Sequence, residues 1–585
     1  MDSGNCELTS AIGMPRIILA RQARLAREVA NAVCRSEIHR RDFLEKSLCA
    51  ATAAGLGLRA GGSPAADDES LFIAGYPNPM SCEPGQQVAL HVSTNAKTFS
   101  LEIAREGAER EIVWTKEDLP GAEYPAGEGS GRPGEAAMNG CAWPAALKLT
   151  IPESWRSGYY SVTMRGTSGT RRTQPVETFF VVRSAVPGGK AKILLELATN
   201  TYHAYNNWGG SCLYSGPKFP RVSFDRPISI YETPLLPGRD WYNPNTNCAH
   251  TWELPFIRWA ERAGYQLDLC CNLDLELHPQ LLPHYRLVLS VGHDEYWSAG
   301  MRDNLETFIA NGGNVAFLSG NTCCWQVRVE DHGRALVCHK RACEDDPAYR
   351  AGQLRGLTTL WSDPRLCRPE NQLTGVGFVY GGYNGLFGEF MDGPGAGTYA
   401  VHRPDHWIFA GTGLKQGDTF GSESGIAGYE CDGCEFVLDG GRPVPTGRDG
   451  TPRNLEILAT APARWSPRDG SLGWARQLRA ALPAAQVVPD DFVHRDGAAV
   501  LGIYSRGGTV VTVGSTDWSD VYGQTIQPTS ECCRSLDLGR RVSFGSQTTS
   551  TTMPCGLIGT GRATGVSVAG RSPGERRPPL NRGGG

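Results

Sequence analysis

Polar side chains able to bind a ligand or a metal ion are concentrated in three short segments of the chain. These are residues 199–214, residues 292–298 with the sequence GHDEYWS, and residues 320–328 with the sequence GNTCCWQVR. Burying tyrosine, histidine, glutamate and asparagine together is costly unless they bond to a ligand, to a metal ion or to one another. If the three segments meet in space, they predict a binding or catalytic site.

Each of these segments directly follows a predicted buried strand. The strands are apolar runs at residues 193–197, 287–291 and 315–319. A further strand at residues 265–269 and helical patterns at residues 252–263 and 301–311 alternate with them. This alternation indicates an α/β domain with a mainly parallel sheet over residues 190–525. Ligands bind at the carboxyl ends of such strands, so the three segments should share one rim.

The region before this domain has a different pattern. Short alternating runs at residues 88–92, 99–103, 147–151 and 179–182 are separated by Pro, Gly and Ser clusters. They predict an Ig-like β-sandwich over residues 70–184, with a linker near residues 187–189.

The two ends of the chain are predicted to lie outside these folds. Residues 1–66 contain the pair Arg40-Arg41, then Phe-Leu and a weakly apolar run, which favours a twin-arginine export signal over a short amphipathic helix. Such a signal predicts a periplasmic or extracellular protein; without a working leader it would be cytoplasmic. Residues 526–585, rich in Ser, Thr, Gly, Arg and Pro, predict a disordered tail.

Composition argues against several classes of partner. Lys plus Arg number 57 and Asp plus Glu number 61, which gives no electrostatic reason to expect nucleic acid or an anionic membrane. After residue 70 there is no run of eighteen apolar residues and hence no predicted membrane span.

Among the 19 cysteines, Cys431 and Cys434 form a CxxC motif, but no second CxxC follows at the spacing of a zinc ribbon. Two loop thiols or a local disulfide are therefore favoured over a metal knuckle.

Four sequence blocks resemble those of the N,N-dimethylformamidase large (beta) subunit family. They are residues 204–210 (AYNNWGG), 222–227 (VSFDRP), 292–298 and 321–328. The resemblance extends from about residue 70 to 520 and implies an Ig-like front segment before an α/β core similar to class I glutamine amidotransferases. In those enzymes a cysteine nucleophile occupies the turn after a buried strand. Here that turn reads Gly-His-Asp-Glu, which argues against a cysteine mechanism.

The resemblance also implies a metal. The family's characterised member is an amidohydrolase with a mononuclear iron held by two tyrosinates and one carboxylate. Carried over, the carboxylate is Glu295 and the tyrosines are Tyr205 and Tyr214, with Tyr202, Tyr231 and Tyr242 left open. Phenolate and carboxylate are hard oxygen ligands that suit ferric iron.

Four more residues match the family's site. His293 precedes the carboxylate, Asn321 matches a substrate-side asparagine, and Lys340 and Glu430 match a lysine and a second carboxylate. Iron would polarise an amide carbonyl, Glu430 could move the water's proton to the leaving amine, and His293 or Asn321 could bond the oxyanion.

The predicted function is therefore iron-dependent hydrolysis of the C–N bond of a small, formamide-type amide, by a homo-oligomer or with a separate small subunit. The alternatives are a non-catalytic exported binding protein and a carbohydrate-active protein on the same scaffold. Without a metal, the tyrosines would be packed aromatics and Glu295 a helix-start carboxylate.

Overall fold

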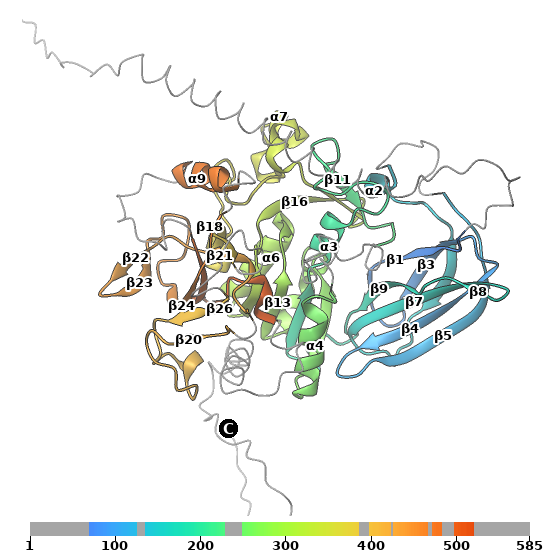
Figure 1. Ribbon diagram of the computed structural model, residues 1–585, viewed down its shortest axis with the longest axis horizontal. Coiled ribbons are helices and arrows are strands. Elements are labelled where there is room, and N and C mark those ends of the chain that lie inside the picture. The colour runs from blue at the N-terminus through green and yellow to red at the C-terminus, as the bar shows by residue number, and fades with distance from the viewer. Residues whose placement is uncertain are drawn as a thin grey trace, which may run out of the picture. The chain divides into compact units, whose positions relative to one another are not determined.

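A computed structural model describes residues 70–125, 135–228, 249–384, 397–422, 425–465, 471–481 and 497–519 (Figure 1). The predicted leader, the predicted tail, Tyr231 and Tyr242 lie outside the described residues.

The front region, residues 73–182, consists of two sheets. The first has the order β1-β3-β6 and is antiparallel; the second has the order β2-β9-β7-β4-β5, with β8 paired to β7. Buried side chains from both sheets, among them Val88, Leu90, Leu101 and Ile103, form one apolar core. The strands are β1 (Ile73–Asn78), β2 (Ser81–Cys82), β3 (Gln87–Thr94), β4 (Thr98–Glu106), β5 (Glu111–Pro120), β6 (Ala145–Thr150), β7 (Gly158–Ser168), β8 (Arg171–Arg172) and β9 (Val176–Val182). The Ig-like assignment of this region stays a prediction.

A nine-stranded sheet follows, in the order β12-β10-β13-β15-β26-β25-β24-β19-β20. Pairing is parallel from β12 to β26 and antiparallel from β26 to β20. The three predicted strands of the rim are β10, β13 and β15. The bounds are β10 (Ile193–Leu197), β12 (Leu267–Cys271), β13 (Leu287–His293), β15 (Asn314–Gly320), β19 (Tyr399–Val401), β20 (Thr419–Phe420), β24 (Glu456–Pro462), β25 (Ala498–Arg506) and β26 (Gly508–Thr512).

Smaller elements lie around this sheet. One small sheet has the order β11-β17-β16-β14, and β18 pairs with β21 and β22 with β23. These strands are β11 (Arg221–Ser223), β14 (Tyr296–Ser298), β16 (Trp325–Glu330), β17 (Ala335–Val337), β18 (Gly377–Asn384), β21 (Tyr429–Gly433), β22 (Phe436–Asp439) and β23 (Arg442–Pro445). The α-helices are α2 (Glu135–Asn139), α3 (Thr199–Tyr205), α4 (Glu253–Arg262), α5 (Asp274–Leu277), α6 (Ala299–Ala310), α7 (Pro347–Arg350), α8 (Asn371–Thr374) and α9 (Ser471–Ala481). The 3₁₀ helices are η2 (Pro279–His284), η3 (Lys340–Asp345), η4 (Leu354–Gly356), η5 (Trp407–Phe409) and η6 (Thr516–Ser519).

Helices α4 and α6 form within one or two residues of the predicted ranges 252–263 and 301–311. The Ser298 hydroxyl accepts a hydrogen bond from the Met301 amide and caps α6, a role that serine favours. Gly264 and Gly312 follow the two helices with φ of 87° and 94°, a conformation that glycine adopts without strain.

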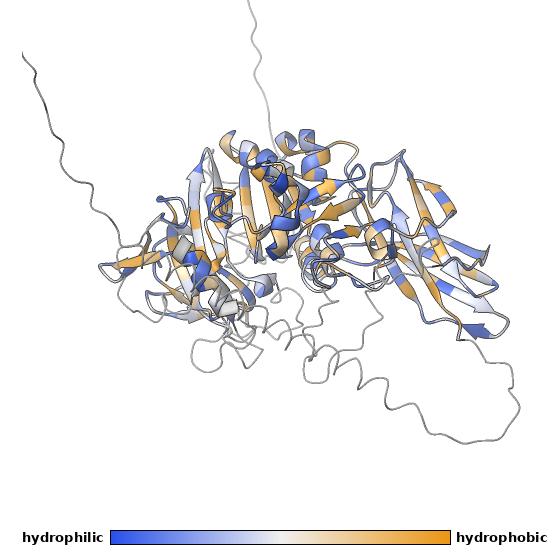
Figure 2. Cartoon of the chain, turned by 90° about the horizontal axis from the view of Figure 1, so that it is seen from above, coloured by the Kyte–Doolittle hydropathy of each residue, from blue (hydrophilic) through white to orange (hydrophobic). Residues whose placement is uncertain are grey.

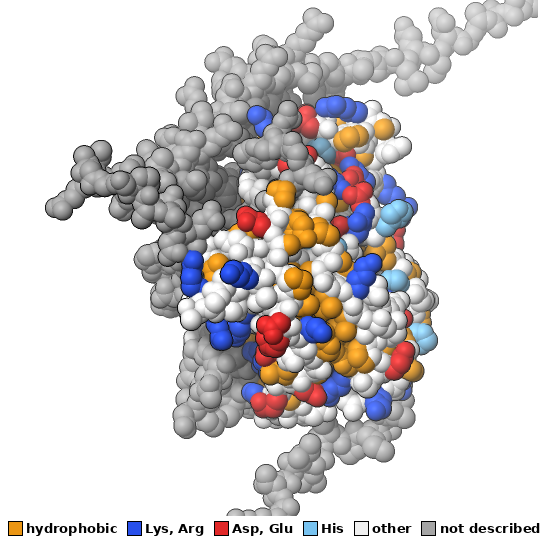
Figure 3. Space-filling view, turned by 90° about the vertical axis from the view of Figure 1, so that its right-hand side faces the viewer, with side chains coloured by type: hydrophobic (Ala, Val, Ile, Leu, Met, Phe, Trp, Pro, Cys, Tyr) orange, Lys and Arg blue, Asp and Glu red, His pale blue; other side chains and the backbone are white. Residues whose placement is uncertain are grey.

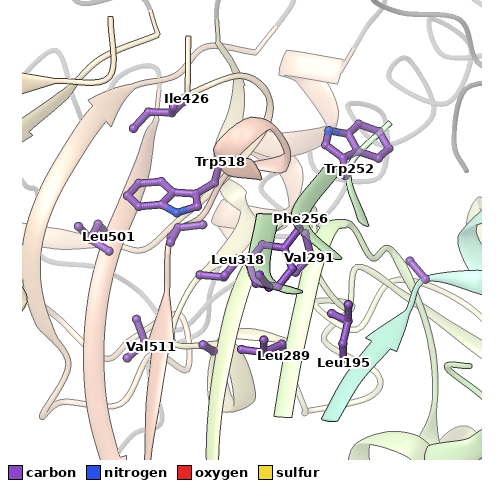
Figure 4. Close-up of a cluster of buried hydrophobic side chains, with 14 of the residues drawn as sticks. Leu195, Trp252, Phe256, Leu289, Val291, Leu318, Ile426, Leu501, Val511 and Trp518 are labelled. Atoms are coloured by element: carbon purple, nitrogen blue, oxygen red, sulfur yellow. The ribbon is translucent and has the colours of Figure 1, made fainter. Parts of the chain in front are cut away.

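The parallel strands are buried on both faces, which explains their continuous apolar sequences. On one face Leu195, Leu289, Val291 and Leu318 lie beside Phe256 of α4 (Figure 4). Figure 2 shows apolar residues concentrated in the strands of this sheet. This packed layer is the rigid base from which the polar segments project.

Other features of the described residues bear on the sequence predictions. Cys431 and Cys434 are both buried as free thiols. Among the described helices, none has the length and apolar composition needed to cross a membrane. Acidic and basic side chains are interspersed with apolar ones on the face shown in Figure 3. That described face offers no large patch of one charge to a polyanion.

Candidate functional site

The polar segments converge because they leave neighbouring parallel strands at the same rim. Helix α3 starts two residues after β10, and His293 ends β13. Gly292 has φ of 82°, and a Cβ atom there would lie 2.4 Å from Cβ of Trp252. Glycine at position 292 therefore lets the chain turn His293 and Glu295 into the rim.

Two tyrosines and one glutamate form the centre of the site. The Tyr214 hydroxyl lies 2.7 Å from the Tyr205 hydroxyl and 3.0 and 3.1 Å from the two carboxylate oxygens of Glu295. The rings of Tyr205 and Tyr214 have centroids 4.5 Å apart. The structure thus brings together all three residues that the resemblance assigns to the metal.

Two further residues belong to this cluster. The Tyr296 hydroxyl donates to that of Tyr214 at 2.9 Å, and Trp325 Nε1 donates to Glu295 Oε1 at 2.8 Å. Residues 296 and 325 are paired in register between β14 and β16. Both lie in the polar segments singled out from the sequence, but only this long-range pairing identifies them as neighbours of Glu295.

His293, Glu430 and Asn321 form a second group beside the first. His293 Nε2 lies 2.8 Å from Glu430 Oε2 and 3.4 Å from Glu295 Oε2. The Asn321 amide donates to Glu430 Oε2 at 3.2 Å, and its own Oδ1 is buried without a hydrogen-bond partner among the described residues. Glu430 comes from β21, whose backbone passes so close that a Cβ on Gly320 would lie 2.3 Å from Glu430 O.

Lys340 completes the site from the start of η3. Its ammonium nitrogen lies 3.1 Å from the centroid of the Tyr214 ring, 4.9 Å from that of Trp325 and 5.1 Å from that of Tyr296. The nitrogen is buried, and the described residues give it no hydrogen-bond partner. Its φ of 53° is uncommon for a residue other than glycine. The strained backbone thus directs a cation onto the face of a candidate ligand.

Burial and neighbouring charges shift the pKa values of Glu295, His293 and Lys340. Burial raises the pKa of Glu295, and His293 and Lys340 oppose that rise. Burial alone would lower the pKa of His293, but the Glu430 carboxylate outweighs it and raises the pKa to about 9. Burial lowers the pKa of Lys340 to about 8 against the attraction of Glu295. The site therefore contains two cations and two carboxylates whose charges depend on one another.

A buried polar layer holds the turn that carries Glu295. The Glu295 amide donates to the Thr201 hydroxyl at 3.0 Å. Asp294 accepts from the Ser290 hydroxyl at 2.7 Å and from the Asn272 amide at 3.1 Å, and Asn272 also donates to Glu196 at 2.6 Å. Since β10, β12 and β13 each contribute to this layer, the turn is fixed to three strands.

Tyr202 and the two cysteines of residues 320–328 are not part of the proposed ligand set. The Tyr202 hydroxyl donates to Glu253 Oε1 rather than to Glu295. Cys323 and Cys324 are buried, and burial raises the pKa of both thiols well above the usual range. That shift disfavours the thiolate that a nucleophile would need.

The donor set fits a hard metal ion. In the described part of the chain there is no group of three or more His, Cys, Asp or Glu side chains that could hold one. Two phenol oxygens and one carboxylate do converge, and such oxygens are ligands suited to ferric iron. The residues present therefore match the ligand set that the resemblance implies.

Comparison with known proteins gives a family match over most of the chain. The family model described as N,N-dimethylformamidase beta subunit-like, C-terminal, matches residues 101–525. The N,N-dimethylformamidase beta subunit of Alcaligenes sp is 25% identical over 376 residues, which is 56% of this chain and 45% of that protein. That of Paracoccus aminophilus is 25% identical over 379 residues, with the same coverage. The chain thus spans less than half the length of these curated relatives.

Solved structures add no argument about function. A multi-modular cell-surface chitinase, ChiW from Paenibacillus sp. str. FPU-7, is similar over 45% of this chain and 21% of its own, with 12% identity and a TM-score of 0.15.

Proposed function

The chain belongs to the N,N-dimethylformamidase beta subunit-like family, and from this premise we propose that it is an iron-dependent amidohydrolase that cleaves the C–N bond of a small, formamide-type amide. The observation that carries the proposal is the Tyr214 hydroxyl, which lies 3.0 and 3.1 Å from the two Glu295 carboxylate oxygens and 2.7 Å from the Tyr205 hydroxyl. We assign the iron to these three residues as a mononuclear, ferric site. Iron bound there would supply Lewis acidity toward the amide carbonyl and would make water more acidic.

The second group of side chains would handle the protons. Glu430 lies beside the cluster, and its carboxylate would take a proton from the attacking water and return it to the leaving amine. His293, held 2.8 Å from Glu430 and cationic at neutral pH, would orient that carboxylate and stabilise charge developing on the carbonyl oxygen. The Asn321 Oδ1 atom, buried without a described partner, would accept an N–H from the substrate.

Lys340 would favour the ionised form of the tyrosine ligand. A cation close to a phenol stabilises the phenolate, and the ammonium lies directly over the Tyr214 ring. Burial raises the pKa of Tyr214 well above its usual range, and a nearby cation would oppose that rise.

We extend the proposal to a partner subunit, because both curated relatives are named as beta subunits. The test is elemental analysis of the purified chain together with hydrolysis assays on a panel of N-methylated formamides and acetamides, with and without a candidate small subunit. We expect stoichiometric iron and amine release from at least one small amide. Iron-free protein after reconstitution, or iron-loaded protein inert toward the whole panel in both assemblies, would contradict the proposal.

A further inference from the structure

A fully buried arginine, Arg226, forms hydrogen bonds with the segment that joins the two candidate tyrosine ligands. Arg226 is 0% exposed. Its Nε donates to Ser223 O at 3.0 Å, Nη1 to Trp208 O and to Ser211 O at 3.3 Å, and Nη2 to His203 O at 3.2 Å. Three of these four carbonyls belong to the segment of residues 203–214, which we call the tyrosine loop.

The guanidinium has no carboxylate to neutralise it in the described part of the chain. The neighbouring Asp225 pairs instead with Arg334 at 3.1 Å. A buried cation without an ionic partner is expensive to desolvate, and its hydrogen bonds to carbonyls must offset that cost. The planar guanidinium can reach several carbonyls at once, which a lysine ammonium cannot do in the same geometry.

The carbonyls that bind Arg226 lie close in sequence to both tyrosines. His203 lies two residues before Tyr205, and Ser211 lies three residues before Tyr214. The loop is closed by the Leu213 amide, which donates to Ala204 O at 3.0 Å. Those two residues directly precede Tyr214 and Tyr205, so this single bond sets the separation of the tyrosines.

A second contact ties the same loop to the segment that carries Arg226. The Asn206 side chain donates to Pro227 O at 2.9 Å. Residues 222–227 supply no group to the cluster around Glu295, although they form one of the four blocks that carry the family resemblance. Their contacts indicate a structural role, because Arg226 and Pro227 form hydrogen bonds with the tyrosine loop.

We propose that Arg226 is a positioning residue that clamps the tyrosine loop and thereby holds the Tyr205 and Tyr214 hydroxyls together on Glu295. The proposed role of Arg226 concerns the conformation of the tyrosine loop. Its consequence for iron rests on the proposed function, because it assumes that these two tyrosines are ligands.

The test compares Arg226→Lys and Arg226→Met with a matched control, Arg302→Met. Arg302 is also 0% exposed, and its guanidinium donates to two backbone carbonyls, Arg368 O at 2.7 Å and Pro369 O at 2.8 Å. Unlike Arg226 it also pairs with a carboxylate, Glu306, at 2.8 Å. Hydrogen exchange of the Leu213 amide reports loop closure without iron. We expect exchange to quicken roughly tenfold or more in both Arg226 variants, because bonds to the loop are lost, and to stay unchanged in Arg302→Met.

The lysine variant keeps the proposal testable if the methionine variant does not fold. It retains the charge, so a purely electrostatic or packing role predicts rescue by lysine, whereas the clamp predicts none. Leu213 exchange that is normal in Arg226→Lys, or equally fast in Arg302→Met, would overturn the clamp.

A spectroscopic arm tests the link to the ligands. In iron-loaded protein the tyrosinate-to-iron absorption band should shift or weaken in Arg226→Lys and not in Arg302→Met. Fast Leu213 exchange with an unchanged band would overturn the positioning role. If the wild-type protein binds no iron, the proposed function fails, and the exchange measurement alone still decides the clamp.

Discussion

Two tyrosine–glutamate pairs, nearly identical in chemistry, lie in different parts of this molecule. Tyr202 donates to Glu253 beside α4, and Tyr214 donates to Glu295 at the rim of the sheet. Both carboxylates are buried, and burial raises the pKa of both. The pairs differ in what surrounds them.

The first pair is enclosed by apolar residues. Tyr202 is 2% exposed and Glu253 0%, and Tyr202 belongs to the main apolar core. The second pair is only partly open: Glu295 is 2% exposed, whereas Tyr214 is 43% exposed although its hydroxyl is enclosed by Tyr205, Tyr296 and Glu295. A tyrosine–glutamate contact is therefore no evidence of a site by itself. Convergence of several oxygens, charges of both signs and the partial exposure of Tyr214 distinguish the second pair.

Replacing the carboxylate of the open pair should have the largest effect. Glu295→Gln keeps the size of the side chain but removes the one carboxylate of the proposed ligand set. We expect loss of iron and of amide hydrolysis, measured by elemental analysis and amine release. The matched Glu253→Gln should retain both. Equal loss in the two variants would erase the distinction between the pairs.

Removing the hydroxyl of the open pair should have the next largest effect. Tyr214→Phe preserves the ring under Lys340 but deletes the oxygen that contacts Tyr205, Tyr296 and Glu295. We expect a large loss of iron affinity and of the visible tyrosinate band. If iron and colour are both retained, Tyr214 is a packing residue and Tyr205 or Tyr296 must be the ligand.

The Tyr202–Glu253 pair should make the free energy of unfolding depend on pH. Burial, partly opposed by the Tyr202 hydroxyl, raises the pKa of Glu253 to about 7. In the unfolded chain this group ionises near about 4.3. The unfolded state therefore releases the proton first, and the free energy of unfolding falls as pH rises from about 4.3 to 7, then levels off.

Glu253→Gln mimics the neutral acid, so its free energy of unfolding should equal that of the wild type at pH 4 and exceed it at pH 8 by up to about 3 kcal/mol. Denaturant unfolding at the two pH values measures this difference, and a constant difference would contradict the shift.

The smallest effect is expected from Tyr202→Phe. It deletes one buried hydrogen bond, for a loss of about 1 kcal/mol of unfolding free energy. Iron content and activity should not change. A loss of iron from this variant would return Tyr202 to the list of candidate ligands.

The sequence was informative where strands are continuous and apolar. Runs at residues 193–197, 287–291 and 315–319 predicted the strands that carry the rim, because strands buried on both faces need apolar residues throughout. The antiparallel half of the nine-stranded sheet gave no comparable signal. Strands β19 and β20 are only three and two residues long, whereas β25 has a buried apolar run that the sequence analysis did not assign.

The same limit applies to the site. His293, Glu295 and Asn321 directly follow core strands, so local sequence was enough to expect them at one rim. Glu430 reaches His293 across 137 positions of the chain (430 minus 293) through contacts that no local pattern encodes. Tyr296 was overlooked because its hydroxyl is directed by the pairing of β14 with β16 rather than by β13.

The central claim is that Tyr205, Tyr214 and Glu295 bind iron, and the visible spectrum of the iron-reconstituted protein tests it most directly. We predict a tyrosinate-to-iron charge-transfer band with a single iron per chain, lost in Glu295→Gln and retained in Glu253→Gln. A colourless, iron-free wild-type protein, or a band that survives Glu295→Gln unchanged, would contradict it.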